Sequence, residues 1–126
     1  MDQDVLVNDR VASGEAALRS LDSNGYPVCA AFWNYYSELG GWRLVIVPEG
    51  FSGGAVTDEL LKIRRAFNQQ STPFDLSDIK LLPASDPLVR ALSKFMRVDG
   101  MSGTRFTGNW IDGVYIEDAY VYRMAL

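Results

Sequence analysis

One stretch of this chain, residues 26–48, constrains the fold more than any other feature. Val28–Tyr36 is apolar or aromatic at nearly every position, on both of its alternating sets of side chains. Such a run is typical of a central strand that is covered on both faces. A second apolar run, Trp42–Val47, follows a turn at Gly40 and Gly41, and glycine permits the positive φ that tight turns need. The sequence therefore predicts a hairpin at the centre of a sheet, with helices packed on it.

Residues 5–23 have the pattern of a first helix. Apolar residues recur there every three or four positions, among them Val11, Leu18 and Leu21, which places them on one side of a helix. Gly14 lies in the same stripe, and glycine costs up to ~1 kcal/mol relative to alanine inside a helix. Two interpretations stay open: Gly14 allows close packing, or the helix breaks there.

Two further helices are expected. One runs from residue 55 or 57 to residue 70, and its apolar stripe is Val56, Leu60, Leu61, Ile63 and Phe67. The other begins at Asp86-Pro87, because aspartate is a good N-cap and proline suits the first helical position. It should end near Asp99-Gly100. Its inward-facing residues are expected to be Leu88, Leu92, Phe95 and Met96.

The last part of the chain predicts a second hairpin. Thr104–Ile111 and Val114–Arg123 have strand character, and Asp112-Gly113 fits a two-residue type I′ turn. Ile79–Leu82 is a short strand that could pair parallel to the first hairpin, so the strand order stays open. We expect residues 1–126 to form one α+β domain, in the order α-β-β-α-β-α-β-β, with helices packed on a mainly antiparallel sheet.

The composition excludes several chemistries. The sequence has no histidine, which removes the usual general base and the commonest transition-metal ligand. The single cysteine, Cys29, lies in the predicted central strand and is expected to be a small buried hydrophobic residue rather than a nucleophile. The formal net charge of −4 argues against non-specific nucleic-acid binding, which needs a surplus of Lys and Arg.

The sequence also bears on location. Residues 1–4 have neither the basic region nor the apolar core of a signal peptide. No apolar run approaches the ~18 residues that a membrane span needs, and one cysteine allows no internal disulfide. We therefore expect a cytoplasmic protein that does not bind a membrane and needs no cofactor.

Three carboxylates, Asp112, Glu117 and Asp118, are the candidates for a metal site. Carboxylates at a strand end can hold Mg²⁺ or Mn²⁺, as in many nucleases. However, no lysine accompanies them in the strand, Glu117 and Asp118 should point to opposite faces, and Asp112 is explained by the turn. A metal-dependent hydrolase or nuclease is therefore kept as an alternative only.

Aromatic residues crowd both hairpins. The candidate partner-binding residues are Trp110, Tyr115, Tyr120, Tyr122 and Arg105. Interfaces favour Tyr, Trp and Arg as anchors, but strands favour aromatic residues in any case, so packing within the sheet is the alternative interpretation. Strict alternation would place Tyr120 and Tyr122 on one face of the strand and Tyr115 on the other.

The segment Gly113–Arg123, with the sequence GVYIEDAYVYR, resembles the closing segment of a set of small uncharacterised bacterial proteins. The helix segment Gly14–Leu18 and the strand segment Ala31–Trp33 match features of the same set. The resemblance covers most of the chain. It implies a bacterial or phage α+β protein and brings no activity with it.

Together these observations favour a non-enzymatic protein that acts by protein–protein contact, of inhibitor, immunity or accessory type, or as a homodimer. Besides the metal-dependent enzyme, a domain that binds a small ligand between sheet and helices remains an alternative.

Overall fold

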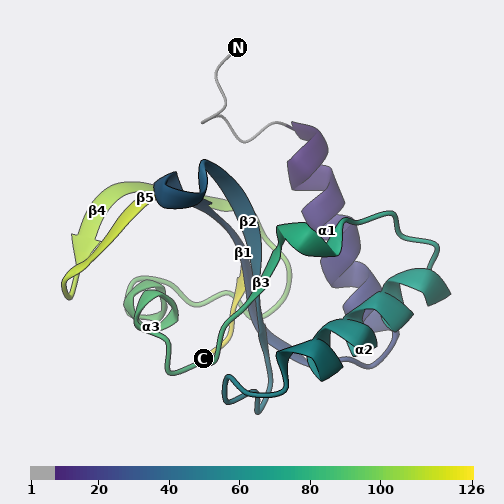
Figure 1. Ribbon diagram of the computed structural model, residues 1–126. Helices are drawn as coiled ribbons and strands as arrows, with labels where there is room; N and C mark the ends of the chain where they lie inside the picture. The colour runs from purple at the N-terminus through teal and green to yellow at the C-terminus, as the bar shows by residue number, and fades with distance from the viewer. Residues whose placement is uncertain (1–7) are drawn as a thin grey trace.

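The computed structural model describes residues 8–126 and confirms the predicted order of elements (Figure 1). The helices are α1 (Asn8–Ser23), α2 (Val56–Gln69) and α3 (Pro87–Ser93). The strands are β1 (Val28–Tyr36), β2 (Gly41–Pro48), β3 (Ile79–Leu81), β4 (Thr104–Ile111) and β5 (Val114–Met124). The predicted start of the first helix, at residues 5–7, lies outside the described residues.

The strands form one sheet in the order β3-β2-β1-β5-β4, with β1 at the centre as the sequence predicts. β1 pairs antiparallel with β2 and with β5, and β4 pairs antiparallel with β5. Only the short β3 is parallel to its neighbour, β2. Asp112 and Gly113 have φ values of 51° and 80°, as the predicted type I′ turn requires.

Helices cover both faces of the sheet, with α1 and α2 on one face and α3 on the other (Figure 1). Trp33 and Leu44 enter the core beneath α1 and α2, whereas Phe32 and Val45 enter the core next to α3. Neighbouring residues of β1 and β2 thus enter opposite cores, which explains why nearly every position in these strands is apolar.

Gly14 permits close contact between α1 and the sheet. Trp33 Nε1 donates a hydrogen bond to Tyr122 Oη at 3.0 Å, and Tyr122 Oη donates to the carbonyl oxygen of Val11 at 2.5 Å. A β-carbon at position 14 would overlap both aromatic side chains. Close packing is therefore the correct interpretation of this glycine, and α1 runs through it without a break.

The third helix is shorter than predicted and ends at Ser93 rather than near Asp99. Val98 exchanges two backbone hydrogen bonds with Met124, each 2.9 Å long. The chain therefore leaves the helix to pair with the end of β5. Phe95, predicted to face inward, lies beyond the helix and is 62% exposed.

The apolar stripe of α2 is also narrower than predicted. Ile63 and Phe67 are buried, but Val56 and Leu61 are exposed. Leu61 is two residues from Ile63, about 200° around the helix, so the two cannot face the same core. Val56 is the first residue of the helix.

Replacing Gly14 with alanine should destabilise the protein. Alanine gains up to about 1 kcal/mol in helix propensity, but its methyl group would displace Trp33 or Tyr122, and overpacking a core costs about 1–3 kcal/mol. We expect the free energy of unfolding, measured by urea denaturation, to fall by up to about 2 kcal/mol.

The matched control is Gly14→Ala in a Tyr122→Phe background, where the hydroxyl that the methyl group meets is absent. The penalty of Gly14→Ala should be smaller there. A penalty of the same size in both backgrounds, or a stabilising Gly14→Ala, would contradict the close-packing account.

Candidate functional site

The β4–β5 hairpin extends past α1 and α2 at one end of the sheet, and α3 lies against its other face (Figure 1). β4 is an edge strand, and most of its residues are exposed. Ile116 and Ala119, which enter the same core, are three positions apart rather than two. The register of β4 with β5 is continuous, but Gly108, between the partners of Asp118 and Ile116, has a φ of 60°. The strict alternation that the sequence predicts for β5 is therefore interrupted between Tyr115 and Tyr120.

Trp110 and Tyr115, called the hairpin pair below, are the most prominent surface feature of this hairpin. They lie opposite each other in the register, with ring centroids 5.1 Å apart. Trp110 is 71% exposed and Tyr115 is 48% exposed. Both strands therefore present a large aromatic side chain to solvent, next to the type I′ turn.

Tyr122, also predicted to bind a partner, is buried instead of exposed. Its side chain is 1% exposed and forms the hydrogen bonds with Trp33 and Val11 described above. Tyr120 is partly buried and packs against Tyr122, with ring centroids 5.4 Å apart. Tyr122 is thus a core residue, and Tyr120 belongs largely to the same packing.

The Arg105 side chain is held by an ion pair within the hairpin. Its Nε and Nη2 each donate a hydrogen bond of 2.6 Å to a different carboxylate oxygen of Asp118. The pKa of the Arg105 guanidinium is raised because Asp118 accepts these hydrogen bonds. The guanidinium also lies over the ring of Trp42, 5.8 Å from its centroid. Arg105 therefore ties the hairpin to the main body of the sheet.

The three carboxylates of the metal hypothesis are not brought together. Asp118 pairs with Arg105, and Asp112 pairs with Lys94 of the segment after α3. Glu117 is exposed on β5. Within residues 8–126, no three His, Cys, Asp or Glu side chains are grouped closely enough to hold a metal ion.

A cleft of about 340 Å³, called the hairpin cleft below, lies between the start of β5, just after the hairpin turn, and the end of β1. It is bounded by the end of β1, the start of β5 and the first turn of α3. Its lining includes Asn34, Tyr36, Glu38, Leu88, Tyr115 and Glu117. Tyr115 thus belongs both to the hairpin pair and to the cleft wall. Sequence reasoning missed this site, although Asn34 is the one amide in the apolar run of β1.

The electrostatics of the hairpin cleft are dominated by acidic groups. Glu38 and Glu117 form no ion pair with any side chain among residues 8–126. The pKa of Tyr36 is raised to about 12, mainly by burial and next by the charge of Asp86. The hydroxyl of Tyr36 therefore stays protonated at neutral pH.

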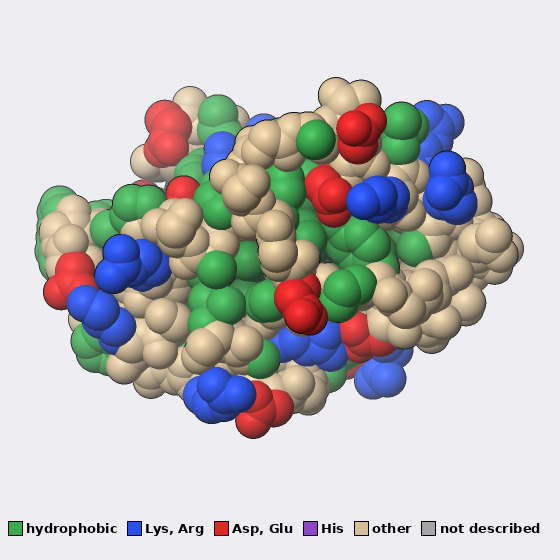
Figure 2. All heavy atoms as spheres, turned by 90° about the horizontal axis from the view of Figure 1, so that it is seen from below, with side chains coloured by type: hydrophobic (Ala, Val, Ile, Leu, Met, Phe, Trp, Pro, Cys, Tyr) green, Lys and Arg blue, Asp and Glu red, His purple; other side chains and the backbone are tan. Residues whose placement is uncertain are grey.

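A second cleft, of about 430 Å³, lies at the opposite end of the sheet, beside α2 and the loops that flank β1 and β2. Figure 2 views the molecule from this side, with hydrophobic side chains in the middle and charges of both signs around them. Tyr26 Oη donates to Glu59 at 2.5 Å, and Lys62 pairs with the same carboxylate at 3.1 Å. The pKa of Glu59 is lowered, chiefly by the hydrogen bond from Tyr26. These polar groups satisfy one another.

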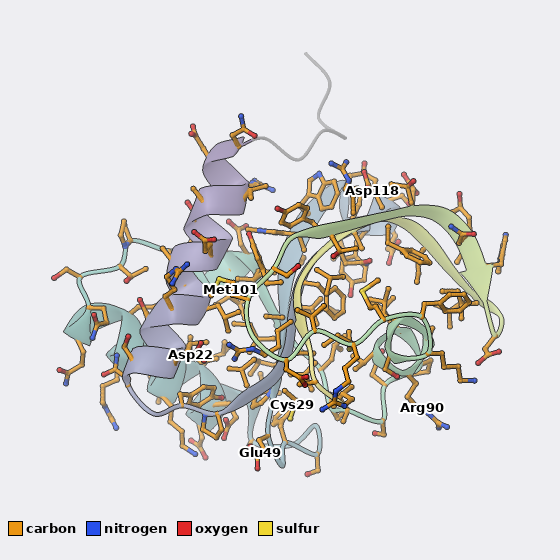
Figure 3. All side chains as sticks on the ribbon, turned by 180° about the vertical axis from the view of Figure 1, so that it is seen from behind. Asp22, Cys29, Glu49, Arg90, Met101 and Asp118 are labelled. Carbon is orange, nitrogen blue, oxygen red and sulfur yellow. The ribbon has the colours of Figure 1, made fainter. Side chains whose placement is uncertain are left out.

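Cys29 lies at this second end of the sheet, far from Asp118 (Figure 3). It is partly exposed rather than buried as predicted, and it is not in a disulfide. Burial raises the pKa of its thiol, and the nearby charge of Glu49 raises it further. Since the thiolate is the nucleophilic form, this environment makes the thiol less reactive.

No family model matches the chain, and neither a curated protein nor a solved structure matches it. Along residues 8–126, no helix has the length and apolar character needed to cross a membrane.

Fluorescence quenching should distinguish Trp110 from the other two tryptophans. Trp33 and Trp42 are 1% and 2% exposed, whereas Trp110 is 71% exposed. We expect iodide to quench the wild-type protein and to have little effect on a Trp110→Phe variant. If the variant is quenched as strongly as the wild type, the hairpin is not arranged as described.

Mg²⁺ and Mn²⁺ should not bind specifically to Asp112, Glu117 and Asp118, because two of these carboxylates are held in separate ion pairs. Calorimetric titration of each metal should give no saturable heat at millimolar concentration. A saturable signal that is lost in Glu117→Gln would restore the metal hypothesis.

Proposed function

We propose that the protein acts by binding another protein through the hairpin pair. The observation that carries this proposal is the exposure of two large aromatic side chains, in contact with each other at an interplanar angle of 44°, at the projecting end of the sheet. Tryptophan and tyrosine are the residues most enriched among those that contribute strongly to binding energy. An aromatic pair in this position adds nothing to the core, so its best explanation is contact with a partner.

The hairpin pair is preorganised for binding. Its two rings hold each other in place, and the backbone beneath them is a regular pair of strands closed by a tight turn. Aromatic side chains have few rotatable bonds, and a preorganised contact surface loses little entropy on association. A partner could therefore gain nearly the full benefit of covering these rings.

Several features support a binding role over catalysis. The sequence lacks histidine, the thiol of Cys29 has a raised pKa, and the acidic groups of the hairpin are largely engaged in ion pairs. We place the protein among non-enzymatic inhibitors, immunity proteins or accessory proteins of a bacterial or phage cytoplasm. This placement rests on the resemblance of its C-terminal segment and on its free cysteine.

Self-association is the second candidate, and one observation favours it. The outer edge of β4 pairs with no other strand among the described residues. An unpaired edge can add a strand from a second copy, which would place two hairpins side by side. Sedimentation velocity at increasing protein concentration distinguishes this candidate from a different partner.

The decisive variant is Trp110→Ala combined with Tyr115→Ala. Tagged wild-type protein should capture a stoichiometric partner from a bacterial lysate, or a differently tagged copy of itself. Loss of the hairpin pair should weaken this capture by at least about 30-fold, since anchor residues contribute about 2 kcal/mol or more. Quantitative mass spectrometry of the bound fraction gives the measurement.

Leu61→Ala is the matched control, because Leu61 is 50% exposed on α2, away from the hairpin. It should leave capture unchanged. Circular dichroism should show that all variants keep the wild-type fold. Equal capture by the double variant and the wild type would overturn the proposal.

A further inference from the structure

The side-chain oxygen of Asn34 has an unusual environment. Asn34 is 5% exposed, and its Oδ1 has no hydrogen-bond partner among the described residues. Its Nδ2 makes a long contact, 3.4 Å from the carbonyl oxygen of Tyr35, and the amide also interacts with the hydroxyl of Tyr36. A buried acceptor without a partner costs about 1–3 kcal/mol, and native proteins leave few such groups.

This amide lines the hairpin cleft. Its oxygen is shielded in the present position, but the terminal torsion of asparagine has a broad energy profile. A small rotation can therefore turn the oxygen toward a donor that enters the cleft. The Trp42 Nε1 atom is also buried without a partner, but Trp42 lines neither this cleft nor the second one.

The charged side chains that line the cleft indicate which kind of hydrogen-bond donor would bind there. Glu38 and Glu117 both line it and both lack an ion pair within the described chain. Two cations lie on the neighbouring strands: Lys80 is over the ring of Tyr36 at 5.3 Å, and Arg43 donates to the carbonyl oxygen of Trp42. Neither of them lines the cleft. A buried acceptor and two carboxylates in the lining favour a cationic group with several N–H donors.

The aromatic wall favours guanidinium over ammonium. Tyr36 and Tyr115 both line the cleft, and the ring of Tyr115 contacts that of Trp110. A guanidinium is flat, stacks on aromatic rings and carries five N–H donors, whereas an ammonium is a compact and strongly hydrated charge. A flat group can lie on the tyrosine ring and donate to a carboxylate at the same time.

From these contacts we infer that the hairpin cleft receives an arginine side chain of the partner protein, with Asn34 and the two glutamates as acceptors. This inference rests on the proposed function and specifies its chemistry. The hairpin pair makes the outer part of the contact, and the arginine enters beside Tyr115. The partner is thus expected to present an arginine at the centre of its binding surface.

The test uses N-acetyl-arginine methylamide as the probe and the full-length ¹⁵N-labelled protein. Titration followed by ¹⁵N–¹H spectra should shift the side-chain amide signals of Asn34 and the backbone signals of Tyr115 and Glu117. A single small fragment should bind with a dissociation constant on the order of 1 mM. The matched neutral probe is N-acetyl-citrulline methylamide, which has nearly the same shape and should bind at least about 10-fold more weakly.

The matched variants are Glu38→Gln with Glu117→Gln, and Glu49→Gln alone as the control. The double variant should weaken binding of the arginine probe by about 10-fold, since it removes both carboxylate charges that line the cleft. Glu49 is an exposed carboxylate that lines the second cleft, so its variant should bind the probe as the wild type does. Three results would each overturn the inference. The first is that no signal shifts at a probe concentration 20-fold above the expected dissociation constant. The others are that the citrulline probe binds as tightly as the arginine probe, or that Glu49→Gln weakens arginine binding as much as the double variant does.

The inference and the proposed function can fail separately. If partner capture depends on the hairpin pair but the probe does not bind, only the arginine site is wrong. If the probe binds as described but capture is unaffected by the Trp110→Ala and Tyr115→Ala changes, the cleft stands as an arginine site and the proposed surface is wrong.

Discussion

The hydrogen bonds that join Trp33, Tyr122 and Val11 are the interaction on which the rest of the structure depends. They link the central strand to the last strand and to the first helix, and so connect parts of the chain far apart in sequence. Burial raises the pKa of the Tyr122 hydroxyl, which therefore remains a donor at all ordinary pH values. Since a buried hydroxyl needs a partner, the first helix must lie close enough to offer its backbone. Only glycine at position 14 leaves the space for that approach.

The packing of α1 and α2 on the sheet also explains why some aromatic residues of the strands are buried and others are exposed. α1 and α2 cover the part of the sheet that contains Trp33, Trp42 and Tyr122, and these side chains form the core there. The β4–β5 hairpin continues past the covering helices (Figure 1). Trp110 and Tyr115 therefore have no layer above them, although their residue types and strand setting resemble those of the buried aromatics. Distance from the helices, rather than strand propensity, decides which aromatic side chains are free to bind.

The limits of prediction follow from this geometry. Local patterns predict the element order and the Asp112-Gly113 turn, because each depends on a few neighbouring residues. They do not predict that Tyr122 is buried and Tyr115 exposed, since that depends on where α1 ends up against the sheet. The prediction that Phe95 faces inward on the third helix was wrong, because the chain leaves the helix early to pair Val98 with Met124. The hairpin cleft joins β1, β5 and α3, so no local pattern could show it, although the amide of Asn34 within an apolar strand was a visible sign.

Asn34 gives the strongest reason to treat the hairpin pair and the hairpin cleft as parts of one binding surface. Folding alone would favour valine at this position, because a β-branched residue suits a central strand and leaves no acceptor unpaired. The amide lowers stability unless something pairs with it. The ring of Tyr115 also contacts that of Trp110, and Tyr115 lines the same cleft as Asn34. One side chain thus belongs to both features, so a partner that covers the hairpin pair necessarily reaches the mouth of the cleft. The unpaired oxygen of Asn34 is thus the reason to expect a donor on the proposed partner.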